Sequence, residues 1–134
     1  MNIPILIAAT LSGLAFLLHT FEGDREVKMF KPAGVQNDGY KMVEIWTMIR
    51  CGWHLISFDL LATSTLLFLI LFTNIIIHEP FLLTLLGIYY IGYGTVFLIT
   101  IAISKPFPWN YLRLWQWIFF YTIGGLIFWG IHLM

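Results

Sequence analysis

The sequence predicts an all-α integral membrane protein, a bundle of four transmembrane helices with both termini on the extracytoplasmic side. Three observations lead to this fold class. Only 10% of the 134 residues are charged and the mean hydropathy is +0.86, whereas soluble domains carry roughly 25% charged residues. Four apolar stretches each approach the ~20 residues that cross a hydrocarbon core as a helix. Basic residues gather in two of the three connections between these stretches.

The four predicted spans belong to a single domain of residues 1–134 and cover residues 3–21, 53–77, 81–104 and 112–133. Lipid offers backbone amides no hydrogen-bond partner, and these stretches lack the alternation of a barrel strand, so they are expected to cross as helices. The first stretch runs into His19 and Glu22 instead of a small-residue cleavage site, so we expect a retained span and not a signal peptide. Pro80 and the KPFPW stretch mark the later turns, because proline disfavours helix in the preceding residue.

The distribution of basic residues predicts the orientation of the helices. All seven belong to the first or the third connection: Arg25, Lys28, Lys31, Lys41, Arg50, Lys105 and Arg113. These two connections share one side of the membrane, which the positive-inside rule assigns to the cytoplasm. We therefore expect a multi-pass protein of the inner (cytoplasmic) membrane, with both termini and the NIIIHEP turn outside.

The first connection, at about residues 22–52, is expected on the cytoplasmic side. Its middle is rich in turn-forming residues, and Asp38 is a candidate N-cap for a helix that begins just after it. From Tyr40 onward, apolar residues recur at helical spacing. This segment is expected either to lie at the interface or to extend the second span downward.

Polar side chains gather at the cytoplasmic ends of the first two spans. His19 and Glu22 lie three residues apart, so they are expected to share a helix face, and Arg50, His54 and Ser57 share a face of the next helix at spacings of four and three. Because the two helices are antiparallel and the groups lie at matching depth, they can meet. The full predicted ligand-binding set is His19, Glu22, Asp24, Arg25, Trp46, Arg50, Trp53, His54, Ser57 and Asp59.

Two kinds of cofactor suit this constellation. A divalent metal is one, because imidazole and carboxylate ligands suit zinc, iron or manganese. The predicted metal set is His19, Glu22, Asp24 and His54. Haem is the other, because His19 with His54, and His78 with His132, would give two histidine pairs at opposite ends of a bundle, the layout of a di-haem carrier.

The arginines of the same region favour other interpretations. Arg25 and Arg50 beside carboxylates and imidazoles are typical of a charge-balanced network that keeps partly buried ions paired. They also suit bidentate binding of an anionic headgroup or a ligand carboxylate. The residues leave the metal, haem, network and anion interpretations open.

Asp59 stands apart from this cluster. It lies five residues deeper in the second span than His54, in a direction about 140° away. An aspartate inside a span costs roughly 3 kcal/mol by insertion scales, and such residues usually face the bundle interior or mark an ion or proton path. The alternative is a protonated, hydrogen-bonded Asp59 with a purely structural role.

The segments HTFEGDR and RCGWHLIS, which begin at His19 and Arg50, resemble a pattern found in an uncharacterised group of small four-span bacterial membrane proteins. The matching residues are His19, Gly23, Asp24, Arg50, Trp53, His54 and Ser57. The resemblance covers about the first half of the chain. It implies a four-span fold and directs attention to this site, but it implies no reaction, because the group has no established activity.

Three functions remain in competition. The favoured one is binding of a metal, haem, quinone or lipid-like ligand at the polar cluster. The second is an accessory or assembly subunit of a larger membrane complex, in which the cluster locks the first two helices together. The third is a proton-coupled transporter or channel subunit that works as an oligomer, with Asp59 on the path.

Composition narrows the chemistry and the partners. No nucleophile-and-base signature, phosphate loop or dinucleotide fingerprint supports an enzyme, and the single Cys51 allows no intrachain disulfide. The expected partner is the lipid bilayer, with a homo-oligomer or a larger membrane complex as the further options. Nucleic acid is not expected, because the basic residues are few and are balanced by acidic ones.

Overall fold

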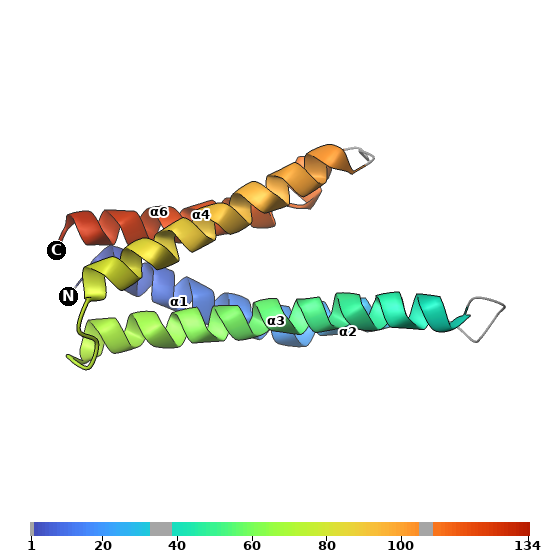
Figure 1. The fold of residues 1–134 in the computed structure, drawn as a ribbon, viewed down its shortest axis with the longest axis horizontal. Helices are drawn as coiled ribbons and strands as arrows, with labels where there is room; N and C mark the ends of the chain where they lie inside the picture. Colours follow the sequence, from blue (N-terminus) through green and yellow to red (C-terminus); the bar gives the residue numbers. More distant parts are fainter. Residues whose placement is uncertain (1, 33–38, 105–108) are drawn as a thin grey trace. The chain divides into compact units, whose positions relative to one another are not determined.

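The computed structural model describes residues 2–32, 39–104 and 109–134, and all regular secondary structure within them is helical. This confirms the predicted all-α class for the described residues. The elements, labelled in Figure 1, are α1 (Ile3–Leu18), η1 (His19–Gly23), α2 (Asp24–Met29), α3 (Gly39–Phe72), α4 (Glu79–Ile103), α5 (Asn110–Arg113) and α6 (Gln116–His132).

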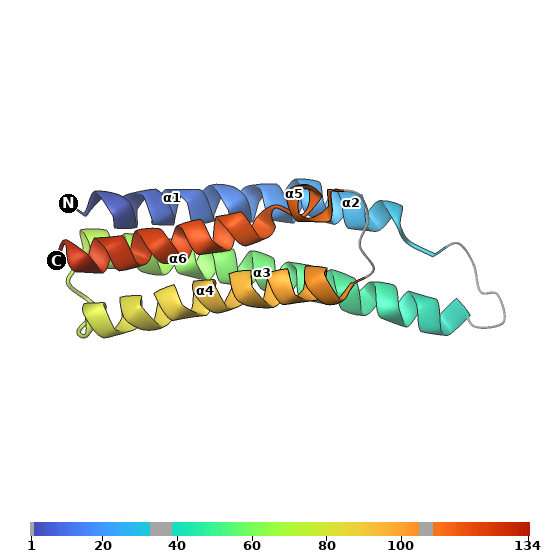
Figure 2. The same ribbon diagram turned by 90° about the horizontal axis from the view of Figure 1, so that it is seen from above.

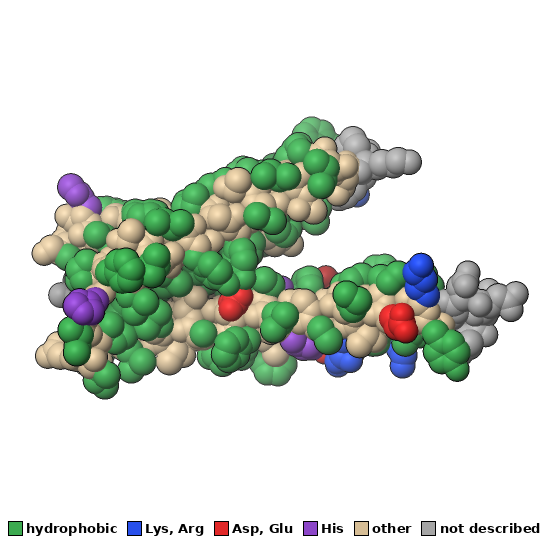
Figure 3. All heavy atoms as spheres, viewed as in Figure 1, with side chains coloured by type: hydrophobic (Ala, Val, Ile, Leu, Met, Phe, Trp, Pro, Cys, Tyr) green, Lys and Arg blue, Asp and Glu red, His purple; other side chains and the backbone are tan. Residues whose placement is uncertain are grey.

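Three stretches of helix are long and apolar enough to cross a membrane, judged by length and composition: Ile3–Met29, Tyr40–Phe72 and Glu79–Ile103. Large apolar side chains stand outward on them, and Leu55, Phe58 and Ile88 are all exposed. Figure 3 shows such side chains over much of the visible helix surface. Apolar surface on this scale fits association with a lipid bilayer. The predicted fourth span corresponds to α6, which has 17 residues.

The second long helix begins earlier than the predicted span. α3 is a single helix from Gly39 to Phe72 (Figure 1), so residues 39–52 extend the span downward. This confirms one of the two alternatives for the segment that follows Tyr40. The helix ends before residue 77, and residues 75–77 are three consecutive isoleucines, whose β-branched side chains are less favourable in helices. The candidate N-cap Asp38 and the basic residue Lys105 lie outside the described residues.

The chain divides into two compact units, one of Thr10–Leu66 and one of Met1–Ala9 with Leu67–Met134. In the latter, α4 packs along α6 (Figure 2). Glycines permit the close approach: Gly87 lies against the Phe128 ring, Gly94 lies against the Tyr121 ring, and Gly124 faces Ile91. In lipid there is no hydrophobic driving force between helices, so close packing of this kind, in which a glycine admits a larger side chain of the partner helix, stabilises such a pair.

The two ends of the chain meet within this same unit. The side-chain amide of Asn2 donates a hydrogen bond of 2.7 Å to the carbonyl of Gly130. Ile5 packs against Gly130, where no larger residue would fit. Figures 1 and 2 accordingly mark N and C close together. The start of α1 and the end of α6 are therefore neighbours.

The glycine pair at residues 124 and 125 offers a matched test of this packing. A Cβ on Gly124 would lie 2.9 Å from Ile91 and 3.2 Å from the backbone oxygen of Gly87, whereas a Cβ on Gly125 meets nothing within 4 Å. We expect Gly124→Val to lower stability by about 1–3 kcal/mol through overpacking and Gly125→Val to have a much smaller effect. Thermal unfolding of the detergent-solubilised protein, followed by circular dichroism, checks this. Equal effects of the two substitutions would contradict the packing described here.

Candidate functional site

The first long helix contains a change of helix type at the candidate site. Figure 2 shows α1 continuing through η1 into α2. In an α-helix, residues five apart point about 140° apart, so His19 and Asp24 would leave the helix in different directions. A π-turn pairs residue i with residue i+5 and brings the two side chains toward one face. Single π-turns inside α-helices frequently mark functional sites.

Asp24 is the centre of a cluster of side chains that comprises Arg50, Lys28 and His54. Its own side chain is only 10% exposed. Arg50 on α3 donates from Nε to Oδ1 at 2.7 Å and from Nη2 to Oδ2 at 3.2 Å. Lys28 Nζ lies 2.7 Å from Oδ2, and His54 Nε2 lies 3.2 Å from Oδ1. The two-pronged arginine pair is among the stronger kinds of ion pair, and it joins α2 to α3.

His19 lies flat on the ring of Trp53. The two ring centroids are 3.9 Å apart and the planes differ by 5°. His19 Nδ1 lies 2.9 Å from the hydroxyl of Ser57, and Trp53 Nε1 donates to the His19 carbonyl at 2.8 Å. Two contacts therefore fix the orientation of the His19 ring: the stack on Trp53 and the hydrogen bond between Nδ1 and Ser57. Its other nitrogen, Nε2, has no hydrogen-bond partner among the described residues, and the residue is half-buried.

Gly23 makes room for this stack. It is the last residue of η1, and a Cβ at this position would collide with the Trp53 indole ring. The close approach of the helix backbone to that ring therefore requires glycine.

Trp46 makes the link nearest the start of α3. Its Nε1 donates to the carbonyl of Val27 at 3.0 Å. Lys31 Nζ and Arg50 Cζ lie 5.8 Å and 5.6 Å from the centroid of its ring. Both distances are within the range of cation–π attraction.

The α3 side chains that make these contacts form one stripe. Their spacings are four, three and four residues, which places them along one side of a helix. Moving along α3, the partners occur in reverse order on the first helix, as antiparallel packing requires: Trp46 meets Val27, Arg50 meets Asp24, Trp53 meets Gly23 and Ser57 meets His19. Further along, Ser64 faces Gly13.

The structure brings together seven of the ten residues predicted for the site: His19, Asp24, Trp46, Arg50, Trp53, His54 and Ser57. Glu22 and Arg25 are exposed and form no ion pair with the described residues. Glu22 was expected on the same helix face as His19. Because of the π-turn, Asp24 lies on that face instead. Asp59 lies further along α3, beyond Ser57, at a position of intermediate exposure.

The predicted metal set is not supported. No group of three or more His, Cys, Asp or Glu side chains within the described residues is placed to hold a metal ion. Glu22 is exposed, and His19 uses Nδ1 for Ser57. His54 does lie at Asp24, but that carboxylate is already shared by Arg50 and Lys28, whose positive charges oppose a metal cation.

The histidine pairs proposed for haem have different surroundings from those expected. His19 rests on Trp53 and Ser57, while His54 lies at Asp24. At the other predicted pair, His78 and His132 are exposed, and no hydrogen bond joins them in the part of the chain that the structure describes.

Two contributors to the site were missed by the sequence reasoning. Lys28 pairs with Asp24 at a spacing of four residues, a signal that helix geometry alone would have provided. The carbonyl of Val27 accepts from Trp46, and no sequence signal identifies a backbone acceptor of this kind.

Comparison of the chain with family models, with curated proteins and with solved structures gives no match.

Asp24 is expected to be essential for joining α2 to α3. Asp24→Asn keeps the shape of the side chain but leaves Arg50 and Lys28 without their counter-charge, so we expect the midpoint of thermal unfolding to fall by several degrees. Glu22→Gln removes the same charge two residues away at an exposed position, and should change the midpoint by no more than about 2 °C. A loss of stability that is equal in both variants would contradict a special role for Asp24.

Gly23 is expected to control the His19 stack. Gly23→Ala should displace the Trp53 ring and lower stability by about 1–3 kcal/mol. It should also remove the upfield ring-current shift of the His19 ring protons in NMR spectra of histidine-labelled protein. The matched control is Gly52→Ala, because a Cβ on Gly52 meets nothing within 4 Å. An unchanged His19 shift in Gly23→Ala would contradict the stacked arrangement.

Proposed function

We propose that this chain is a four-span protein of the inner membrane that binds a small, non-metal ligand through His19 and the cluster around Asp24. In this proposal both termini lie outside, and the cluster lies at the cytoplasmic end of α1 and α3. The chain then belongs with the small four-span bacterial membrane proteins that it resembles.

The contact between the chain ends supports an even number of spans. Asn2 and Gly130 are hydrogen-bonded, so the two ends lie on the same side of any membrane that the chain crosses. Three helices meet the length expected of a span. The 17 residues of α6 lie at the lower limit of about 17–25 residues for a transmembrane helix. Counting α6 as a span makes four and returns the chain to its starting side.

The positive-inside rule supports the orientation. Five basic residues lie within the described parts of α2, α3 and the segment after α2: Arg25, Lys28, Lys31, Lys41 and Arg50. Figure 3 shows the Lys and Arg side chains visible in that view mainly near the amino-terminal end of α3. In an inner membrane such an end faces the cytoplasm.

The observation that carries the binding function is the fixed, half-buried ring of His19. Trp53 holds its face and Ser57 holds Nδ1. The Ser57 hydroxyl donates its single hydrogen to the carbonyl of Trp53 at 3.3 Å, so it accepts from Nδ1–H of His19, and Nε2 of a neutral His19 is then a hydrogen-bond acceptor. A pre-oriented imidazole acceptor beside an aromatic ring suits a small organic ligand that offers a polar hydrogen, such as a hydroxyl group. A cluster that only locked the two helices together would not require Nε2 of His19 to remain without a protein partner.

The accessory-subunit function is the second candidate, and one observation favours it. The bonds from Arg50, Trp53, Ser57 and Trp46 all join α3 to the same helix. A cluster whose only task is to lock two helices would make these bonds. The transporter alternative depends on Asp59, which takes no part in them.

Native mass spectrometry of gently purified protein tests the binding function. We expect wild-type protein to retain a small organic molecule and His19→Gln to lose it, because the amide lacks the imidazole ring that stacks on Trp53. Ser57→Ala should weaken retention about tenfold, because a hydrogen bond that orients the ring contributes about 1 kcal/mol or more. His132→Gln, at an exposed histidine near the end of α6, is the matched control and should retain the molecule.

Two outcomes would overturn this function. The first is a wild type that carries no small molecule, or carries one that His19→Gln retains equally, which would leave the accessory role. The second is a metal or a haem absorbance band in the wild type, detected by elemental analysis and an absorbance scan of the same sample.

A further inference from the structure

A closed set of hydrogen bonds fixes the protonation pattern of the His19 ring. The ring donates from Nδ1–H to the Ser57 hydroxyl at 2.9 Å, and that hydroxyl donates to the carbonyl of Trp53 at 3.3 Å. Trp53 in turn donates from Nε1 to the carbonyl of His19 at 2.8 Å and stacks on its ring. Because Ser57 has a single hydrogen and has used it, Nε2 of a neutral His19 can accept a hydrogen bond but cannot donate one.

The Nε2 atom of His19 is accessible from outside the protein. Among the described residues, the buried polar side-chain atoms without a hydrogen-bond partner belong to Ser12, Thr20 and Gln116. His19 is only half-buried and Nε2 is not one of these atoms. The unpaired acceptor therefore lies at the open edge of the ring, and the two contacts that fix the ring also fix the direction in which the acceptor points.

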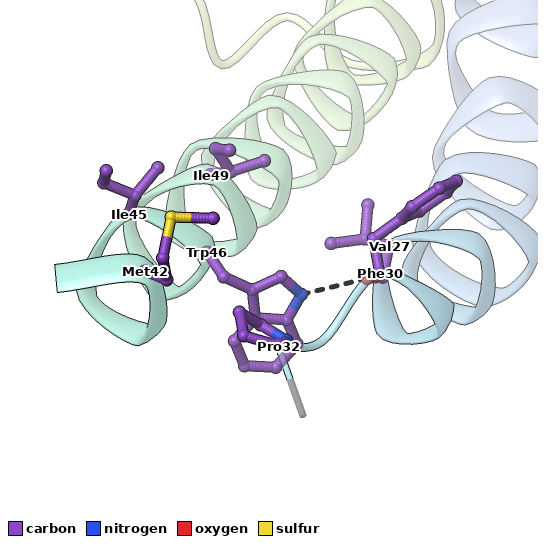
Figure 4. Close-up of a pocket in the computed structure, with 7 residues that line it drawn as sticks. All are labelled: Val27, Phe30, Pro32, Met42, Ile45, Trp46 and Ile49. Atoms are coloured by element: carbon purple, nitrogen blue, oxygen red, sulfur yellow. Dashed lines mark hydrogen bonds between the residues drawn. The ribbon is translucent and has the colours of Figure 1, made fainter. Parts of the chain in front are cut away.

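The interface between the two helices is closed on the cytoplasmic side of His19. Figure 4 shows Trp46 of α3 reaching across to Val27, whose carbonyl accepts from its Nε1 at 3.0 Å. The ion pair of Arg50 with Asp24 forms the next layer of contacts. Two layers therefore separate His19 from the start of α3, so a ligand reaches Nε2 from the lipid-facing side of the helices and not along the interface.

In the proposed topology, this open edge lies within the hydrocarbon core. Ser57, which is level with His19, is about 22 Å along α3 from Phe72 at 1.5 Å per residue. With Phe72 at the outer edge of a ~30 Å core, His19 lies about 8 Å inside the inner edge. Leu17 and Leu18, just before it, are exposed. A ligand at this depth must dissolve in hydrocarbon, because a charged group is costly there.

We propose that His19 binds a lipid-soluble phenol, such as an alkyl hydroquinone, that enters from the bilayer. The phenolic O–H donates to Nε2, and the alkyl tail remains among the acyl chains. A phenol is a stronger hydrogen-bond donor than an aliphatic alcohol because its hydrogen is more acidic. The oxidised quinone offers only carbonyl acceptors, which cannot pair with an acceptor nitrogen. The site therefore selects the reduced form.

This ligand class rests on the proposed function and its topology, and it adds the chemistry that the His19 site recognises. An acceptor that is left alone in hydrocarbon is unfavourable, so a donor from the lipid phase has a gain to make at Nε2. No electron transfer is part of the proposal, since binding alone distinguishes the two redox forms.

The test compares three ligands that carry the same decyl tail: the hydroquinone, its quinone and the dimethyl ether of the hydroquinone. Apparent Kd values come from native mass spectrometry of the full chain in detergent, with the hydroquinone kept under anaerobic, reducing conditions. We expect the hydroquinone to bind at least about tenfold more tightly than either of the others, because only it gives Nε2 a donor.

Two variants and one control connect this preference to the His19 ring. His19→Gln should bind all three ligands weakly and equally, because an amide carries both a donor and an acceptor. Ser57→Ala releases Nδ1, so either form of the ring can exist, and the preference for hydroquinone over quinone should largely vanish. A purely structural role of Ser57 would not change that ratio. His132→Gln, at an exposed histidine, should keep the wild-type preference.

Nitrogen-15 NMR spectra of histidine-labelled wild-type protein check the same premise without a substitution. We expect the proton of neutral His19 on Nδ1 and an unprotonated Nε2. Added hydroquinone should shift the Nε2 signal, and added quinone should not.

The outcomes separate this ligand class from the proposed function. No binding of the hydroquinone, equal Kd values for hydroquinone and quinone, or a neutral His19 with its proton on Nε2 would each overturn the ligand class. If wild-type protein nevertheless retains a small molecule that depends on His19, the proposed function stands and only the phenol is wrong. If no retained molecule depends on His19, both fail.

Discussion

The carboxylate of Asp24 is the constraint on which the rest of this region depends. A buried carboxylate is costly unless it is paired and hydrogen-bonded, so its burial requires cations and hydrogen-bond donors around it. Lys28 comes from the same helix, but Arg50 and His54 come from α3, and their pairing fixes which part of α3 meets α2. Once Arg50 is opposite Asp24, the spacing along α3 brings Trp53 under Gly23 and Ser57 to His19. The ion cluster thus sets the register, and the neighbouring contacts follow from helix geometry.

Two different kinds of packing hold the helices, one in each unit. α4 and α6 meet through glycines that lie against aromatic rings, which is the way apolar helices associate where lipid removes the hydrophobic driving force. The first helix and α3 meet instead through polar side chains such as Ser57 and Asp24, and through two tryptophan N–H groups that donate to backbone carbonyls. The polar contacts are directional and specify one arrangement, which is why the candidate site lies on the second kind of interface and not on the first.

Much of this organisation could be predicted from the sequence, and the failure of the predicted metal set has one physical origin. Hydropathy alone gave the apolar helices, and the spacing of Arg50 and Ser57 placed them correctly on one face because α3 is regular throughout. The corresponding argument for His19 and Glu22 failed, because η1 is a π-turn and ordinary helical spacing does not hold across it. That irregularity moved Asp24 into the interface and left Glu22 exposed, and with Glu22 outside, the predicted metal set lost a ligand. No pattern in HTFEG predicts a π-turn. The ion pair between Asp24 and Lys28, in contrast, could have been predicted from their spacing of four residues on a helix.

The geometry also explains why α3 is longer than a membrane requires. A helix that ended at the hydrocarbon edge, near Trp53, would have the stack on His19 but neither Arg50 nor Trp46. The additional turns supply the counter-charge that Asp24 needs, and they carry Trp46 to the carbonyl of Val27. In the proposed orientation they also carry apolar side chains, including Met42 and Ile45, past the edge of the hydrocarbon core. Arg50 belongs to both regions, since it binds Asp24 and lies over the Trp46 ring. A ligand that drew Arg50 away from Asp24 would leave that carboxylate to Lys28 and His54 alone.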